Sequence, residues 1–163
     1  MIRININIGE VQKRLNFFRS LVKDTTPLMR AVAGIMLNST KKNFAESGRP
    51  RWVESARAKR EGGKTLQDSG LLLRSLESHS GRNYAMVGTN MKYAAIHQFG
   101  GKTRPHIIRP RDKGGLYWPG AAHPFQSVNH PGSKIPARPF LLLTTLEEKK
   151  IEQAAIKYLG DAK

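Results

Sequence analysis

Four histidines in the second half of the chain are the side chains most suited to metal chemistry. They are His97, His106, His123 and His130, and Asn129 stands beside the last of them. Neutral imidazole is a common metal ligand, and a bound metal ion could hydrolyse nucleic acid. A nuclease of this kind needs a metal-binding histidine on a helix, but Pro131 and Pro136 predict a loop after His130. We therefore expect solvated or structural histidines, with a metallonuclease as the alternative.

Other catalytic patterns in the sequence are incomplete. Ser69-Gly70 lacks the second glycine of a nucleophile elbow. Residues 62–65 imitate the end of a phosphate-binding loop, but the position that needs the first glycine of that motif holds Ala58. The 12 carboxylates form no distinctive pair for acid–base work. The sequence therefore predicts no enzymatic activity and no cofactor.

Positive charge is the strongest chemical signal, because 28 Lys and Arg against 12 Asp and Glu give a net charge of +16. Such a chain attracts polyanions or acidic protein surfaces. We expect two long basic loops, at about 45–65 and 101–134, where glycine and proline accompany the charge. The candidate contact residues in these loops are Arg49, Arg51, Trp52, Arg57, Arg60, Arg104, Arg109 and Arg111. Trp52 could stack on a base or insert into a partner. A solvated face is the alternative for both loops.

The size and composition set the remaining bounds. A chain of 163 residues is the size of one ordinary domain, so we expect a single domain over 1–163. The absence of cysteine excludes disulfides and thiolate metal sites. The longest apolar runs are too short to cross a bilayer, and the first residues do not form a signal peptide, so we expect a cytoplasmic protein with no membrane contact.

Hydrophobic periodicity predicts the elements of the N-terminal third. Isoleucines alternate with polar residues over 2–8, which is typical of a strand with one buried face. Apolar residues then recur every three or four positions over 11–22, as in an amphipathic helix. Pro27 favours a new helix start, and a second helix follows over 28–44.

The remaining elements are shorter. The predicted elements are a helix over 66–76, a hairpin over 76–88 with its turn at 80–83, a helix over 91–99, edge strands at 106–108 and 116–118, and a closing helix over 151–158. The expected fold class is therefore α+β, with helices packed on a small, mostly antiparallel sheet and two long basic loops.

Three segments carry a family resemblance. Residues 66–72, 87–101 and 135–141 resemble the phage virion morphogenesis family, whose members are also called tail completion proteins. Trp52 followed by Ser55 is similar to a tryptophan-serine element of the same family. The resemblance spans roughly residues 28–160, and its most specific part is the run from Tyr93 to Gly101.

The resemblance implies a non-enzymatic structural component of a tailed phage or Mu-like prophage. Such a protein would act in tail completion and head-tail joining, as part of a ring at the tail or neck. Its partners would be other tail and neck proteins and further copies of itself, with nonspecific contact to channel DNA. It would assemble in the host bacterial cytoplasm and remain in the virion. A nonspecific DNA-binding protein is the first alternative, and an HNH-like metallonuclease the second.

The family-like segments also contain residues expected to shape the structure. These are Gly70, Tyr93, Phe99, Gly100, Gly101, Pro136, Pro139 and Phe140. Tyr93 and Phe99 lie on one helix face and are expected in the core, and the glycines permit a sharp exit from the helix. His97 is expected to make a structural hydrogen bond or an intersubunit contact. Arg138 is expected either in an ion pair at the core edge or as an interface anchor.

Overall fold

Helices α1 (Gly9–Lys23) and α2 (Thr26–Ala45) begin the computed structural model, which describes residues 9–111 and 114–160. Both helices are confirmed close to their predicted bounds. Between them the Asp24 carboxylate accepts a hydrogen bond from the Thr26 backbone N–H, and Pro27 occupies the first turn of α2. The strand predicted over 2–8 lies outside the described residues.

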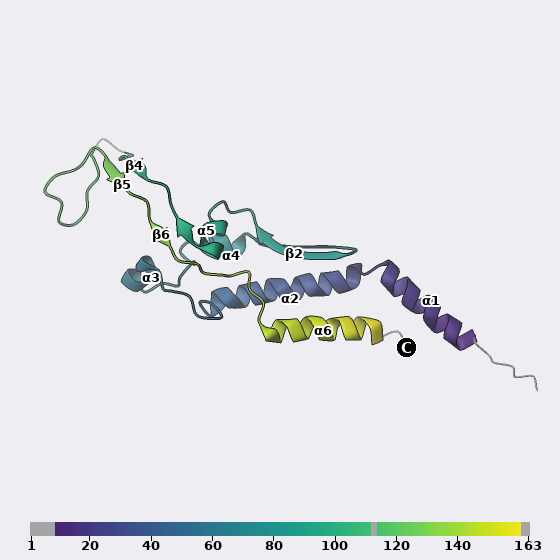
Figure 1. The fold of residues 1–163 in the computed structure, drawn as a ribbon. Coiled ribbons are helices and arrows are strands. Elements are labelled where there is room, and N and C mark those ends of the chain that lie inside the picture. Colours follow the sequence, from purple (N-terminus) through teal and green to yellow (C-terminus); the bar gives the residue numbers. More distant parts are fainter. Residues whose placement is uncertain (1–8, 112–113, 161–163) are drawn as a thin grey trace, which may run out of the picture. The chain divides into compact units, whose positions relative to one another are not determined.

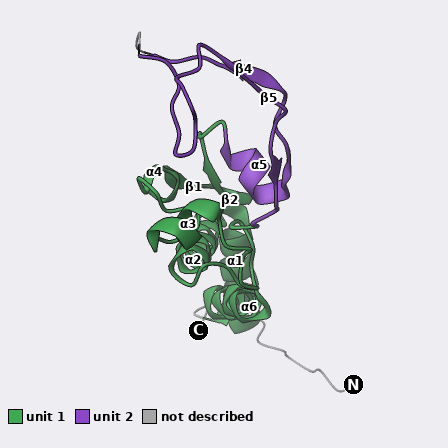
Figure 2. Cartoon of the chain, turned by 90° about the vertical axis from the view of Figure 1, so that its left-hand side faces the viewer, with its two compact units in different colours: residues 1–92, 139–163 green, residues 93–138 purple. Residues whose placement is uncertain are grey.

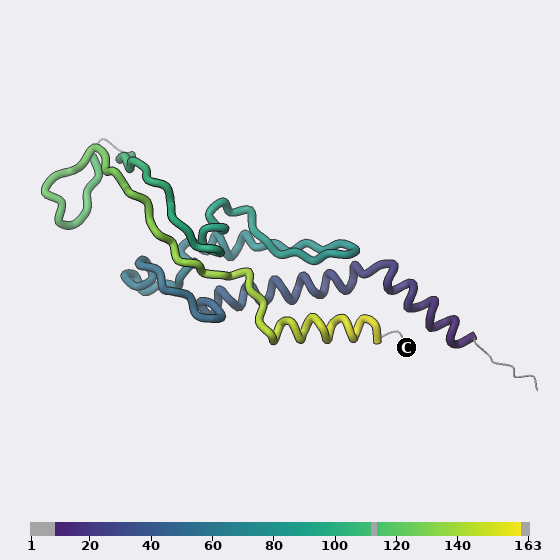
Figure 3. The backbone as a smooth tube through the Cα atoms, viewed as in Figure 1, coloured from purple at the N-terminus to yellow at the C-terminus, as the bar shows by residue number. Residues whose placement is uncertain are grey.

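Helix α2 is the centre of the first of two compact units, which comprises Met1–Lys92 and Pro139–Lys163 (Figure 2). The predicted hairpin is confirmed as β1 (Leu76–Gly81) paired with β2 (Tyr84–Thr89). Helix α2 lies between this hairpin and α6 (Thr145–Gly160), and it contacts both (Figures 1 and 3). The centre of this unit is therefore a hairpin layer packed on α2, with α6 on the other side of α2, in agreement with the predicted α+β class.

An aromatic cluster fills the interior at the C-terminal end of α2. Phe44 and Phe140 are buried with ring centroids 5.5 Å apart, and Trp52 meets Phe44 edge-on at 5.6 Å. The Trp52 indole N–H donates to the Pro139 carbonyl at 3.2 Å. The cluster joins segments almost a hundred residues apart and anchors the segment that leads into α6.

The segment 45–65 contains a helix that the loop prediction missed. Helix α3 (Ala56–Glu61) begins at Ser55, whose hydroxyl accepts from the Ala58 N–H, and ends at Gly62 with φ of 73°. Six residues, three of them basic, are too few to show an apolar stripe. The helix predicted over 66–76 is shorter than expected, since α4 covers only Leu71–Arg74.

The second compact unit comprises Tyr93–Arg138. It opens with α5 (Ala94–Phe99), which confirms the predicted helix with a later start. Strand β3 (Gly101–Lys102) then pairs with β6 (Lys134–Ile135), and β4 (His106–Ile108) pairs with β5 (Val128–His130). An isolated bridge joins Leu116 and Phe125, in place of the strand predicted at 116–118. Residues 101–135 therefore run out and back as one antiparallel excursion, named the basic arm below.

One correction and one agreement concern the ends of elements. The closing helix begins at Thr145, earlier than the predicted 151, because polar residues fill its first turn and hide it from a search for apolar periodicity. At the base of the basic arm, Gly100 has φ of 73°, and a Cβ there would lie 2.8 Å from the Ala137 backbone nitrogen. The sharp exit expected from the glycine pair is therefore required by both backbone conformation and space.

Candidate functional site

The basic arm carries an unbalanced positive charge. Its described basic residues are Lys102, Arg104, Arg109, Arg111 and Lys134. Of the whole sequence from 101 to 135, the single carboxylate is Asp112, which lies outside the described residues. Every ion pair found among residues 9–111 and 114–160 lies in the first unit, so none of them neutralises the arm. The arm can therefore accept an external anionic group.

Two lysines in the arm face each other across a strand pair. Lys102 and Lys134 are register partners in the β3–β6 ladder. Like charges placed directly opposite each other destabilise an antiparallel pair. A partner that supplies negative charge at this position would remove the repulsion, so the arrangement favours an anionic surface against the base of the arm.

Stacked rings occupy the outer half of the arm. The Trp118 and Phe125 rings are nearly parallel, with centroids 4.9 Å apart, and His123 stacks on Phe125 at 4.8 Å. Trp118 is 44% exposed and its neighbour Tyr117 69% exposed. Amphipathic aromatic residues and arginine are the residue types enriched in protein interfaces. The arm thus combines charge with exposed aromatic surface.

The histidines do not gather into a metal site. His106 and His130 are register partners with ring centroids 5.0 Å apart, whereas His123 belongs to the aromatic stack. Asn129 pairs in register with Ile107. Within residues 9–111 and 114–160, no group of three or more metal-binding side chains could hold an ion. The metallonuclease alternative therefore finds no assembled site in the part of the chain that the structure describes.

His97 lies on α5 with its Nδ1 atom buried and without a hydrogen-bond partner. Its backbone carbonyl accepts a hydrogen bond from the Arg138 N–H at 2.7 Å. Burial lowers the pKa of His97, and the positive charge of Arg138 lowers it further. Arg138 is itself buried, and burial lowers the pKa of its guanidinium. Arg138 is therefore buried, whereas the His97 side chain is half-buried with its Nδ1 atom inside.

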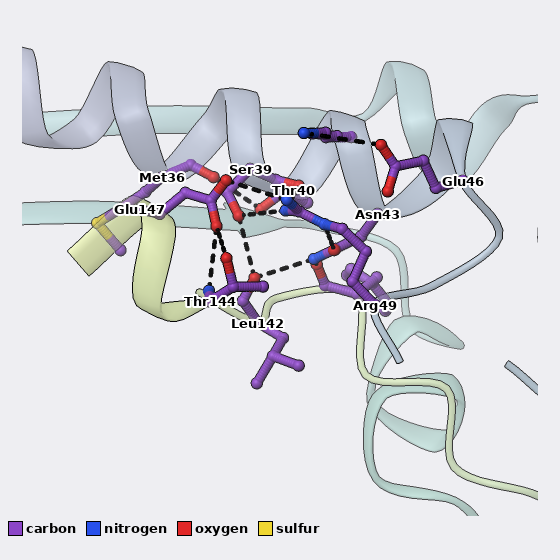
Figure 4. A network of polar contacts seen from close by, with 11 residues as sticks. Met36, Ser39, Thr40, Asn43, Glu46, Arg49, Leu142, Thr144 and Glu147 are labelled. Atoms are coloured by element: carbon purple, nitrogen blue, oxygen red, sulfur yellow. Dashed lines mark hydrogen bonds and ion pairs between the residues drawn. The ribbon is translucent and has the colours of Figure 1, made fainter. Parts of the chain in front are cut away.

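Arg49 lies in a network of polar contacts that joins α2 to the start of α6 (Figure 4). Its guanidinium donates to Asn43 Oδ1 at 2.8 Å, to Ser39 Oγ at 2.8 Å and to Glu147 Oε1 at 3.0 Å. The Asn43 amide in turn donates to the Phe140 and Leu142 carbonyls at 2.8 and 2.9 Å. The Arg49 side chain is only 14% exposed. Its role is therefore intramolecular, unlike the exposed loop contact expected from the sequence.

Glu147 completes the Arg49 network. Its second oxygen accepts hydrogen bonds from the backbone N–H and the hydroxyl of Thr144. Burial acts to raise the pKa of the Glu147 carboxyl, but the hydrogen bonds from Thr144 and Arg49 and the Arg49 charge outweigh it and lower the pKa to about 2. Glu147, Asn43 and Ser39 were not identified from the sequence, because no spacing rule connects residues that lie about a hundred positions apart.

The other candidate residues divide by environment. Trp52 is buried in the aromatic cluster, so it is unavailable for the base stacking considered from the sequence. Arg57 is held by the Lys64 carbonyl at 2.8 Å and lies within ion-pairing distance of Glu61 and Asp68. Arg60 pairs with Glu61 but is largely exposed, and Arg51 is exposed. In the segment 45–65, Arg51, Lys59 and Lys64 take part in no ion pair among the described residues, whereas in the basic arm this holds for all five described basic residues.

The residues expected to shape the structure also divide. Phe140 is buried as predicted, and Gly70 adopts φ of 72° immediately before α4. Pro139 accepts the Trp52 hydrogen bond, and Pro136 lies half-buried after β6. The prediction that Tyr93 and Phe99 are core residues is wrong, since they are 43% and 79% exposed. A six-residue helix offers too short a face to bury both rings.

Three comparisons with known proteins complete the description. The profile of the phage virion morphogenesis family matches residues 6–160. Mu-like prophage FluMu G protein 2 of Haemophilus influenzae is 37% identical over 152 residues, covering 93% of this chain and 91% of that protein. Putative capsid assembly protein G of Escherichia phage Mu is 26% identical over 171 residues, covering 98% and 94%. No solved structure matches.

The described residues contain no helix long and apolar enough to span a membrane. The match agrees with the resemblance in the sequence, which rested on residues 66–72, 87–101 and 135–141. The match extends over almost the whole chain and includes both compact units. The chain belongs to the phage virion morphogenesis family.

Proposed function

We propose that this protein acts as a structural component in tail completion and head-tail joining, as part of a ring at the tail or neck, and that its basic arm binds an acidic surface of a neighbouring virion protein. The proposal rests above all on the cationic arm, where Lys102 opposes Lys134 and no described carboxylate neutralises the charge. The family match supports a role in virion assembly. The name of one relative, putative capsid assembly protein G, also supports a role in virion assembly.

The net charge argues for assembly on a partner rather than for free self-association. Each copy carries +16, so copies repel one another unless an acidic surface or salt compensates. The free protein is therefore a monomer or small oligomer in the host cytoplasm, and the ring closes only on the tail or neck. Closure on a symmetric surface also fixes the number of copies.

Nonspecific binding to channel DNA is the second candidate function. The observation that favours it is the exposed Trp118 and Tyr117 within a basic segment, since aromatic rings and cations together bind nucleic acid without sequence preference. For DNA binding, the logarithm of the binding constant would fall linearly with the logarithm of the salt concentration. Titration with random-sequence DNA at several salt concentrations separates this candidate from binding to an acidic protein.

The test of the main proposal reverses three exposed arginines of the arm, Arg104, Arg109 and Arg111, to Glu in the parent phage. The reversal lowers the net charge from +16 to +10 (16 − 6). Single surface ion pairs contribute about 0–1 kcal/mol, so three together are needed for a clear effect. We expect unjoined heads and tails by electron microscopy and a fall in infectious titre, with unchanged circular dichroism and melting.

A matched control reverses three exposed lysines of α6, Lys149, Lys150 and Lys157, to Glu. This control also gives +10 (16 − 6), so it separates the location of the charge from its amount. The proposal requires the control to assemble normally. Normal assembly by the arm variant, or equal failure of both variants, would contradict a specific role for the arm.

A further inference from the structure

Helix α1 exposes an apolar stripe with the spacing of a coiled-coil seam. The stripe consists of Val11, Leu15, Phe18 and Val22, at intervals of four, three and four. These are alternating d and a positions of a heptad repeat. The four side chains are 41–67% exposed, and α1 contains no buried residue. The α1 stripe is therefore an apolar helix face that this chain leaves uncovered.

The attachment of α1 leaves the stripe available. The Tyr158 hydroxyl of α6 donates to the Leu21 carbonyl at 3.3 Å and to the Asp24 carbonyl at 2.7 Å. These contacts involve the backbone at the end of α1 and none of the four stripe side chains. In Figure 1, α1 continues past the end of α6. The helix is thus anchored at one end while its apolar face stays open.

Basic residues flank the stripe on both sides. With Leu15 and Val22 at a positions, Arg14 occupies a g position and Arg19 an e position. Both arginines are exposed, and neither takes part in an ion pair among the described residues. The whole helix carries four basic residues and one acidic residue, a net charge of +3 (4 − 1). A second copy would place Arg14 opposite Arg19 in a parallel pair, where like charges repel.

From this pattern we infer that α1 is a docking helix for an acidic amphipathic helix of another protein. Such a partner inserts apolar a and d residues against the stripe and places Glu or Asp opposite Arg14 and Arg19. Charges at e and g positions choose the partner and its orientation. Phe17 at a c position is 42% exposed and Leu21 occupies a g position, so the apolar face is wider than the a/d seam, and the choice of a helix rests on the charges of Arg14 and Arg19. The α1 stripe and the basic arm are different segments of the chain. This inference can therefore fail while the proposed function holds, and the proposed function can fail while this inference holds.

The test uses the full chain and two fluorescent 28-residue helical probes. Both probes carry Leu at every a and d position, but one has Glu and the other Lys at every e and g position. We expect the protein to bind the acidic probe, and the basic probe at least tenfold more weakly. The variant Arg14→Glu with Arg19→Glu should bind the acidic probe with at least tenfold lower affinity, and it should bind the basic probe more tightly than the parent protein does.

Two further variants separate docking from general attraction to a cationic protein. Lys13→Glu with Lys23→Glu makes the same charge change at f and b positions, which face away from the seam. It should retain acidic-probe binding within about threefold. Leu15→Asn keeps all charges, and it should lose binding at least tenfold. Circular dichroism of each variant confirms that the chain is folded.

Several results would overturn the inference. Equal losses in the two charge-reversed variants, or unchanged binding by Leu15→Asn, would mean that the acidic probe binds by charge alone. A concentration-dependent dimer in light scattering that Leu15→Asn abolishes would assign the stripe to a second copy of this chain. Binding to phosphatidylglycerol vesicles that Leu15→Asn abolishes, without binding to either probe, would assign it to a membrane surface.

Discussion

Replacing Glu147 by Gln should destabilise the first unit strongly. The carboxylate is the acidic partner of Arg49 at 3.0 Å, and the two side chains are 4% and 14% exposed. Its other oxygen accepts both hydrogen bonds from Thr144. An amide removes the negative charge and one acceptor, and it leaves the Arg49 cation buried without a counterion. Breaking a buried ion pair from one side costs about 3–5 kcal/mol.

A change of this size is readily measured. For a chain of this length, 1 kcal/mol shifts the melting temperature by about 2–4 °C, so Glu147→Gln should melt roughly 6–20 °C below the parent protein. Glu148→Gln is the matched control, because Glu148 is exposed and lies on the same turn of α6. Surface substitutions usually stay within about 0.5 kcal/mol. Calorimetry and urea unfolding at pH 7 measure both variants.

The pH dependence gives an independent check on the same carboxyl. Its folded-state pKa of about 2 lies below the ordinary value of 4.5, so the unfolded state binds the proton more readily. The stabilisation by Glu147 is therefore fully present above pH 4.5 and is lost as pH falls toward 2. The parent protein and Glu147→Gln should converge in stability over this interval. Equal stability of Glu147→Gln and Glu148→Gln at pH 7 would refute the assigned role of the Arg49 network.

Three further predictions concern the core and the basic arm. Gly100→Ala should cost about 1–3 kcal/mol, because Gly100 has φ of 73° and no room for a Cβ, whereas Gly34→Ala in open space within α2 should be neutral or stabilising; equal melting temperatures would contradict the geometric argument. Trp52→Ala should cost about 3–5 kcal/mol in urea unfolding while Val53→Ala, at an exposed position, stays within about 0.5 kcal/mol, and a small effect at Trp52 would mean that the aromatic cluster is not a core. Limited trypsin digestion with mass mapping should cut the free protein within 101–134 and spare that segment in assembled particles, and equal cleavage in both states would argue against an arm buried in the virion.

Periodicity in the sequence was sufficient to predict the elements whose residues follow a regular pattern of apolar and polar side chains. The stripe over 11–22 and the hairpin around 80–83 were predicted because each pattern depends on neighbours within a few residues. The α+β class followed from the predicted helices and strands, and the concentration of charge in 101–134 followed from the local composition. Helix α3 was missed because six residues, with only two alanines among them, are too few to show a periodic pattern.

Tertiary structure alone decided which arginines are buried and which are exposed. Arg49 and Arg104 are equivalent as basic residues beside glycine or proline, yet Arg49 is buried against Glu147 while Arg104 is exposed in the basic arm. Likewise, Phe140 is buried and Phe99 exposed although both stand in family-like segments. Local patterns indicate which face of an element is apolar, whereas burial and ion pairing depend on which distant segment packs against that face. This packing joins segments about a hundred residues apart, and no local spacing in the sequence predicts it.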